Sequence, residues 1–408
     1  MASSSTDARL DQMQMMIQQQ NQEIQQLQAD EANEASAAQM NEATQAQVGA
    51  LQDKVNAVSD ADKGGWWYNT KVSGRMYFDI TDATQKTNGA DTTFKGYSFD
   101  IKRFYIGIDH KFDDMWSANI TTDFTYDSNS SAKATQLYIK KAYLDAHIDD
   151  ALDVKLGSTD LPWIPFAEGV YGYRYVENTL IDRTKIGTSA DWGVHLSGKF
   201  ADGMFSYAIS AINGAGYKAP PGPGNGVKFK SIDVEGRVSA NIDDFVVAVG
   251  GYTGKLGKDM ELASPAPSHT ATRFNALAAY KTKEITAGVE YFSANDWNSV
   301  TSSTTDKEQG WSGFASYKFD PQWAIFGRYD SVNEKLAQPS ANKPDDTYYN
   351  AGIEWSPTKI VSLSLVYKHD NAKHGALANQ NGTSTLGSTT LPRTGTYNEL
   401  GIFGILQW

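Results

Sequence analysis

From Trp66 to the C-terminus, apolar and polar residues alternate with a period of two in segments of roughly 10 to 13 residues, the length that tilted membrane strands need. In the first segment one parity is apolar: Val72, Gly74, Met76, Phe78 and Ile80. The other parity is mostly polar: Lys71, Ser73, Arg75, Tyr77 and Asp79. Charged residues on the inner parity exclude a dry core, so the pattern predicts a barrel with a wet lumen and a lipid-facing outer wall.

The connections between these segments alternate in length. Short turns are expected at Asp113–Asp114, Asp149–Asp150, Ala201–Gly203, Asp243–Asp244, Thr282–Lys283, Asp320–Pro321 and Pro357–Thr358. Long loops are expected near 81–96, 127–135, 159–190, 214–230, 255–271, 294–308, 333–346 and 371–395. Fifteen connections join sixteen antiparallel strands. Outer-membrane barrels have short periplasmic turns and long outer loops, so both termini are expected on the periplasmic side.

A different pattern precedes the barrel and divides the chain into a helical segment, 1–62, and a barrel, 66–408. Residues 8–58 lack Pro and are rich in Gln, Ala, Glu and Met, which favour a helix. Apolar residues recur at heptad spacing, which predicts a periplasmic coiled coil. Over residues 28–47 the heptad positions are no longer apolar, so the predicted coiled coil is weaker there. The heptad positions are Leu10, Met13, Ile17, Ile24, Leu27, Val48, Leu51, Val55 and Val58. A flexible polar helix or linker remains the alternative.

Composition removes several classes of protein. The chain has no Cys, which excludes disulfides, zinc–thiolate sites and catalytic thiols, and we expect neither a metal site nor a cofactor. The net charge of -12 argues against a nucleic-acid partner, since phosphate groups require a basic surface. No run of about 18 apolar residues occurs, which leaves a barrel as the way to cross a bilayer. The start, Met1–Ser5, lacks a secretory signal, and we expect that one was removed.

Two stretches resemble the phosphate-selective porin family. Residues 191–216, DWGVHLSGKFADGMFSYAISAINGAG, are similar to a hairpin of that family, and residues 154–162, VKLGSTDLP, are similar to the entry into its third loop. The resemblance covers about 66–408 and implies a trimeric porin of sixteen strands whose third loop folds inward and narrows the pore. Some relatives, including DcaP-like porins, carry an N-terminal coiled coil. The last segment ends on Trp408, as outer-membrane barrels often end on an aromatic residue.

The third loop departs from the family's phosphate pattern of clustered Lys and Arg, because it mixes both charges. The sequence therefore does not predict phosphate specificity; opposed charges would orient polar solutes without strong ion preference. The predicted constriction consists of Arg174, Glu177, Asp182, Arg183 and Lys185. The predicted lumen wall facing it includes Arg75, Arg103, Lys141, Lys199 and Arg237. For any of these residues, stabilising the loop or simple exposure to solvent is the alternative to filtering.

An enzyme is not predicted. Residues 187–191, GTSAD, miss the last glycine of a nucleophile elbow, and residues 250–256, GGYTGKL, are too short for a phosphate loop. We expect a homotrimeric outer-membrane porin in contact with lipid and lipopolysaccharide, through which small polar solutes or ions diffuse passively. The alternative is a structural anchor whose periplasmic coiled coil tethers peptidoglycan or a partner protein.

Overall fold

The structure is a computed structural model that describes residues 15–16, 20–21, 23–28, 44–54, 65–126, 135–218, 228–260, 265–336, 345–373 and 394–408. The chain divides into two units, Met1–Tyr68 and Asn69–Trp408. Among the described residues, no helix is both long and apolar enough to cross a membrane.

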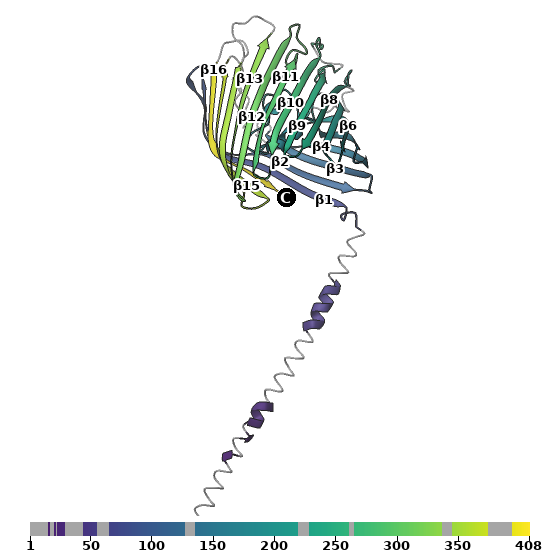
Figure 1. Cartoon of the computed structure of the whole chain (residues 1–408), viewed down its shortest axis with the longest axis vertical. Helices are drawn as coiled ribbons and strands as arrows, with labels where there is room; N and C mark the ends of the chain where they lie inside the picture. Colours follow the sequence, from purple (N-terminus) through teal and green to yellow (C-terminus); the bar gives the residue numbers. More distant parts are fainter. Residues whose placement is uncertain are drawn as a thin grey trace, which may run out of the picture. The chain divides into compact units, whose positions relative to one another are not determined.

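The second unit is a closed antiparallel barrel of sixteen strands, as the sequence predicted (Figure 1). Each strand pairs with its neighbours in the chain, and β1 closes the ring by pairing with β16. The strands are β1 (Thr70–Thr87), β2 (Ala90–Lys111), β3 (Trp116–Tyr126), β4 (Thr135–Asp149), β5 (Leu152–Asp160), β6 (Ala190–Phe200), β7 (Phe205–Ile212), β8 (Asp233–Ile242), β9 (Phe245–Gly254), β10 (Ala271–Lys281), β11 (Ile285–Asn295), β12 (Asp306–Asp320), β13 (Trp323–Leu336), β14 (Asp345–Trp355), β15 (Val361–Lys373) and β16 (Thr394–Gln407). All seven predicted short turns fall between consecutive strands at one end of the barrel, here called the short-turn end.

The alternation along the strands separates an inner from an outer surface. On β1, Asp79 is buried inside the barrel while its neighbour Ile80 is exposed on the outer wall. On β8, Glu235 is buried and Val234 and Val238 are exposed. An apolar outer wall around a polar interior is the arrangement of a barrel that lies in a bilayer.

The first predicted long loop is wrong. Instead of a loop over residues 81–96, β1 continues to Thr87 and β2 begins at Ala90, so a two-residue turn joins them. Asn88 and Gly89 occupy this turn with φ of 51° and 82°. Asn-Gly is the preferred pair for such turns because both central residues need positive φ. The predicted loops 127–135, 214–230, 333–346 and 371–395 lie largely outside the described residues.

Two β-bulges bring extra positive charge into the barrel. The register of β2 against β1 shifts at Lys102, and the register of β4 against β3 shifts at Lys140, so each is an extra residue in its strand. A bulge re-aims side chains that strict alternation would send outward. Lys102 and its neighbour Arg103 both form ion pairs inside the barrel, and Lys140 and Lys141 both line the lumen.

The described residues of the N-terminal unit, apart from the turn at 65–68, are helical. Their larger apolar side chains are exposed: Met15, Met16, Ile24, Leu27, Val48 and Leu51. The predicted heptad residues Leu10, Met13, Ile17, Val55 and Val58 lie outside the described residues. The helix is therefore observed in these parts, and the coiled coil remains a prediction.

Gly157 is expected to be essential for pairing β4 with β5. Its φ is 128°, and a Cβ at this position would lie 2.2 Å from the carbonyl oxygen of Ala142. Backbone strain alone should make Gly157→Ala destabilise the barrel by about 1–3 kcal/mol. The clash of the new Cβ with the carbonyl oxygen of Ala142 should add to this loss of stability. Heating in SDS and following the loss of compact gel migration measures the effect. Gly169→Ala, which meets nothing within 4 Å, is the matched control, and an equal transition temperature for both variants would contradict this account.

Candidate functional site

The third long loop, residues 161–189, folds into the barrel between β5 and β6. It forms two short helices, α2 (Ile164–Tyr171) and α3 (Leu180–Arg183). A proline near the first turn of α2 favours the helix start. Gly172 ends α2 with a φ of 84°, and its N–H donates to the carbonyl oxygen of Glu168. These local signals give the loop a fixed shape.

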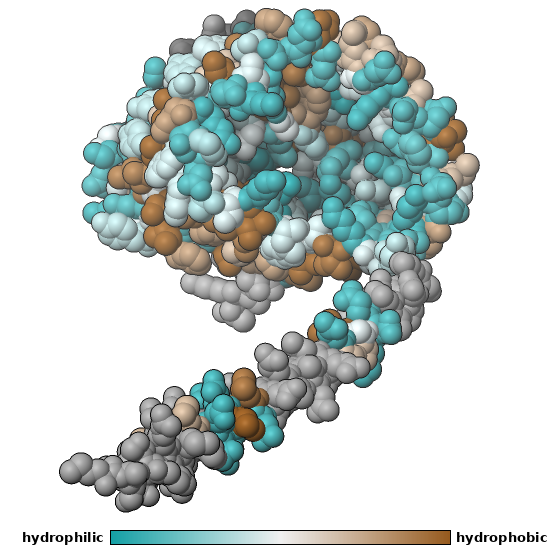
Figure 2. All heavy atoms as spheres, turned by 60° about the horizontal axis from the view of Figure 1, so that its bottom comes forward, coloured by the Kyte–Doolittle hydropathy of each residue, from teal (hydrophilic) through white to brown (hydrophobic). Residues whose placement is uncertain are grey.

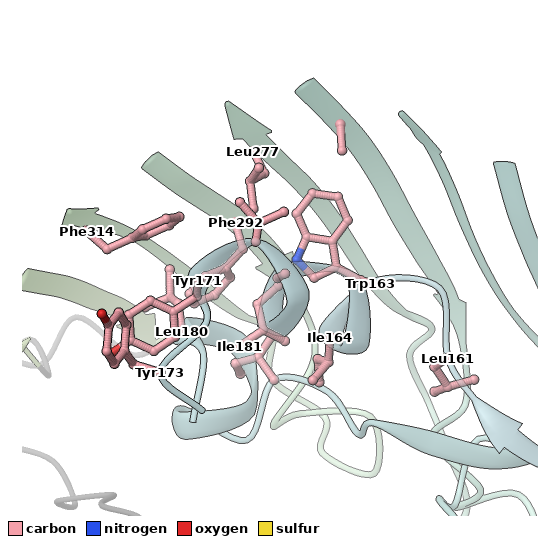
Figure 3. Packing of buried hydrophobic residues seen from close by; sticks show 14 of the residues in the cluster. Leu161, Trp163, Ile164, Tyr171, Tyr173, Leu180, Ile181, Leu277, Phe292 and Phe314 are labelled. Atoms are coloured by element: carbon pink, nitrogen blue, oxygen red, sulfur yellow. The ribbon is translucent and has the colours of Figure 1, made fainter. Parts of the chain in front are cut away.

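An apolar cluster holds one side of the third loop against β10 to β13. Trp163 is completely buried, and its indole N–H donates to Glu290 Oε1 over 2.8 Å. Tyr171 packs edge-on against Phe314, with 5.5 Å between ring centroids. Figure 3 shows these rings between the loop and the strands. The loop therefore fills one side of the lumen and leaves the other side open.

Ion pairs with the barrel wall stabilise the same side of the third loop. The guanidinium of Arg183 is fully buried and donates to Asp330 (3.0 Å), Asp346 (2.6 Å) and Asp370 (3.3 Å) on β13, β14 and β15. Arg328 on β13 shares Asp330 at 2.6 Å. Removing one partner of such a buried set leaves uncompensated charge, which costs about 3–5 kcal/mol. Arg183 thus positions the loop and does not face the open lumen.

Glu177 is the second buried charge that fixes the loop. It lies 3.4 Å from Lys368 Nζ, which also lies 3.2 Å from Glu399. Burial alone would raise the pKa of Glu177, but Lys368 and Lys102 outweigh it, so the pKa lies below the ordinary value. Glu177 therefore stays ionised behind the loop, where it is fully buried and does not face the open lumen.

The open side of the lumen is a cavity of about 930 Å³ between the third loop and β1 to β5. Figure 2 looks at one end of the barrel, where hydrophilic residues surround a hollow. The charged residues lining the cavity are Arg75, Asp109, Lys140, Lys141, Asp160, Glu168 and Arg174.

On the loop side of the gap, Arg174 lies between two carboxylates. Its Nε donates to Glu168 Oε1 at 2.5 Å, and its Nη2 lies 3.3 Å from Asp182 Oδ2. Burial opposes the charge of Arg174, but Glu168 and Asp182 raise its pKa overall. The loop thus presents a fixed triad of one positive and two negative groups.

On the wall side, two of the four basic residues are neutralised locally. Arg103 Nη1 lies 3.1 Å from Asp123, and Lys141 Nζ lies 2.5 Å from Asp160. Among the described residues, Arg75 and Lys140 form no ion pair, and Lys140 instead lies over the ring of Tyr105 at 4.7 Å. Of these four basic residues, therefore, only Arg75 and Lys140 carry positive charge without an ion-pair partner among the described residues.

Three of the ten residues singled out in the sequence line this gap: Arg75, Lys141 and Arg174. Two more do not line it but have a contact close by: Asp182 lies 3.3 Å from Arg174, and Arg103 pairs with Asp123. The remaining predicted residues lie elsewhere. Lys185 is exposed and lines a separate cavity of about 260 Å³ together with Lys258. Lys199 is exposed next to the short turn after β6. Arg237 donates to the carbonyl oxygen of Pro162 over 2.9 Å and so anchors the start of the third loop.

Three contributors were not predicted. Lys140 was missed because its bulge breaks the alternation. Tyr105 and Tyr217 carry no charge, and nothing in their spacing marks them. Beside Tyr217, Lys218 lies 4.9 Å from the ring of Tyr138, and burial and Arg103 lower the pKa of Lys218. The part of the wall that lines the gap here consists of Lys140, Lys141, Tyr105 and Tyr143.

Solved structures share this fold at low sequence identity. The anion-selective porin from Comamonas acidovorans is 10% identical, covers 83% of this chain and 99% of its own, and has a TM-score of 0.56. The outer membrane channel DcaP of Acinetobacter baumannii is 14% identical, covers 81% and 96%, and has a TM-score of 0.52. The trimer form of OmpT of Vibrio cholerae is 14% identical, covers 83% and 99%, and has a TM-score of 0.53. At these identities the likeness shows the fold.

Sequence comparison adds a match over one part of the chain. No curated protein sequence matches the chain. The model of the phosphate-selective porin O and P family matches residues 70–165, from the start of β1 to the first turn of α2. The resemblance seen in the sequence is confirmed, and residues 70–165 carry the signature of the phosphate-selective porin O and P family.

Proposed function

We propose that the protein is a water-filled porin through which small hydrophilic solutes diffuse passively. The observation that carries this proposal is the polar gap between the third loop and β1 to β5, inside a barrel whose outer wall is apolar. Liposomes that contain the purified protein should swell in isotonic solutions of small uncharged sugars, more slowly as the sugar grows. Swelling no faster than that of protein-free liposomes would contradict the proposal.

The charges around the gap favour a modest preference for anions. Arg103, Lys141 and Arg174 have carboxylate partners, whereas Arg75 and Lys140 have none among the described residues. Uncompensated charge of one sign at a pore lining selects ions by sign. Arg75, Lys140, Lys141 and Arg174, which line the gap, would act as the filter, supported by Asp182 and Arg103 next to it. Glu177, Arg183 and Arg237 would hold the third loop in place.

We also propose that the protein is a homotrimer in the outer membrane, with a periplasmic N-terminus and contacts to lipopolysaccharide. The trimer form among the similar structures supports three copies. The exposed apolar residues of the N-terminal helix, such as Ile24 and Leu51, fit a coiled coil between copies.

Deleting residues 1–62 should lower the temperature at which the trimer dissociates in SDS, because each copy would lose its share of the apolar seam. The intact chain is the control. If the trimer is equally stable without the segment, the exposed apolar residues are better explained by a tether to peptidoglycan or to a periplasmic partner.

A further inference from the structure

Two consecutive basic residues of β2 lie inside the barrel, where strict alternation would place only one. Lys102 is the extra residue of the bulge, and Arg103 follows it directly. In a regular strand one of the two would face lipid, where a charged side chain is costly. The bulge keeps both charges inside and changes the direction of each side chain. As a result, the two residues contact different parts of the barrel.

Arg103 contacts the part of the wall that leads to the gap. Its Nη1 lies 3.1 Å from Asp123 Oδ2 on β3. Tyr105, two residues further along β2, lines the gap itself. The position of this part of β2 therefore determines where one face of the gap lies.

Lys102 contacts β1 and β16 instead. Its Nζ lies 2.9 Å from Asp79 Oδ2 on β1, and the two side chains are only 2% and 1% exposed. The same Nζ lies over the ring of Phe403 on β16, 4.2 Å from the ring centroid. An aromatic ring attracts a cation above its face, and the attraction grows where water is excluded. Lys102 is thus held by two strands at once.

The ring of Phe403 also contacts the lysine that holds the third loop. Lys368 Nζ lies 4.0 Å from the centroid of this ring. Lys368 donates to the carbonyl oxygen of Val176 over 2.7 Å and lies 3.4 Å from Glu177, both in the third loop. Phe403 and Val176 are completely buried. A series of buried contacts therefore runs from the third loop through Lys368 and Phe403 to Lys102 on the gap wall.

Lys102 also acts on the third loop through its charge. Burial would raise the pKa of Glu177, and Lys368 and Lys102 together bring that pKa below its ordinary value. Salt screens such buried charges only weakly. Removing Lys102 would therefore weaken the hold on Glu177 as well as the pair with Asp79. Tyr175, two residues before Glu177, lines the gap, so a shift of this part of the loop changes the width of the gap.

We propose that Lys102 is a positioning residue that ties the third loop to the wall of the gap and so sets the width of the gap. The inference rests on the proposed porin function and adds a residue that holds its constriction. Lys102 acts through Phe403, Lys368 and Glu177 rather than by contact with the solute. Without it the third loop leaves the wall more often, and the gap admits larger solutes.

Labelling of a single cysteine measures this opening directly, because the natural chain contains no cysteine. Val176→Cys places a small thiol at a completely buried position of the third loop, which a water-soluble maleimide reaches only when the loop leaves the wall. In this background Lys102→Met keeps much of the length of the side chain and removes its charge. The labelling rate should rise by about tenfold or more, because a contact to a buried charge contributes at least that factor to an equilibrium.

Lys155→Met in the same background is the matched control. Lys155 on β5 also pairs with a wall carboxylate, Asp145 at 3.9 Å, and also lies over an aromatic ring, that of Tyr143 at 5.3 Å. Its pair joins β5 to β4 and not to the third loop. This variant should label at the rate of the Val176→Cys parent.

A second variant, Asp79→Asn/Lys102→Met, separates positioning from simple stability. It removes both charges of the buried pair, so the transition temperature in SDS should return toward that of the parent while labelling stays fast. Labelling at the parent's rate in this variant would overturn the proposal, because Lys102 would then act on Asp79 alone. The double variant decides the question by itself if Lys102→Met does not fold.

Liposome swelling by the same proteins connects the loop to the gap. Larger sugars should enter faster, relative to small ones, in each variant that labels faster. Faster labelling with an unchanged dependence on sugar size would also overturn the proposal, since the loop would move without widening the gap. A wild-type protein that causes no swelling refutes the porin function, and the labelling rates then still show whether Lys102 holds the third loop.

Discussion

Replacing Arg183 with methionine is expected to release the third loop from the barrel wall and to give a larger, unsteady conductance. Methionine keeps much of the length of the side chain but removes the guanidinium that contacts Asp330, Asp346 and Asp370 together. Leaving buried carboxylates without their partner costs about 3–5 kcal/mol. That energy changes the ratio of docked to released loop by roughly a hundredfold or more. Single-channel recording and limited proteolysis of the loop measure the change.

Arg75→Met is the matched control for this prediction. Arg75 also carries a guanidinium inside the barrel, but it lines the open cavity and does not touch the buried carboxylates. The control should keep the loop resistant to protease and should conduct steadily. If Arg183→Met conducts as steadily as wild type and resists protease equally, the charged contact does not position the loop.

Removing the two uncompensated cations of the gap is expected to shift ion selectivity toward cations. In Arg75→Gln/Lys140→Gln the side chains stay polar while two positive charges disappear from the cavity lining. A charge near a permeating ion in a wet pore contributes about 1 kcal/mol, which is roughly fivefold in the permeability ratio. The reversal potential in a salt gradient reports this ratio directly, and the effect should shrink as ionic strength rises.

Lys199→Gln/Lys318→Gln controls for net charge, because both lysines are exposed near short turns and neither lines the cavity. This variant should keep the wild-type reversal potential. Equal shifts in the two double variants would mean that overall charge, rather than the gap, sets selectivity.

The alternation of residues was enough to predict the barrel, its sixteen strands and its short turns, because a side-chain period of two follows directly from strand geometry. It failed where the geometry departs from this period. Lys102 and Lys140 lie in bulges, which the sequence does not mark. The polar residues 81–96 have the composition of a loop, and the Asn88–Gly89 pair within them is the one local signal for a two-residue turn.

The site was harder to predict, because its contacts join residues far apart in the chain. The sequence places Arg183 in the third loop, and only the fold shows that Asp330, Asp346 and Asp370 surround it. A charged residue in an inward loop can face water or face the wall, and its own segment carries no signal for either. Arg174 and Arg183 are therefore equivalent in the sequence and different in the structure.

Single-channel recording of the wild-type protein in planar bilayers with a salt gradient tests the central claim most directly. The gap beside the third loop predicts steady ohmic current, with a reversal potential that indicates a modest preference for anions. Absence of current from correctly folded trimers would contradict the account of an open channel and would favour a structural anchor.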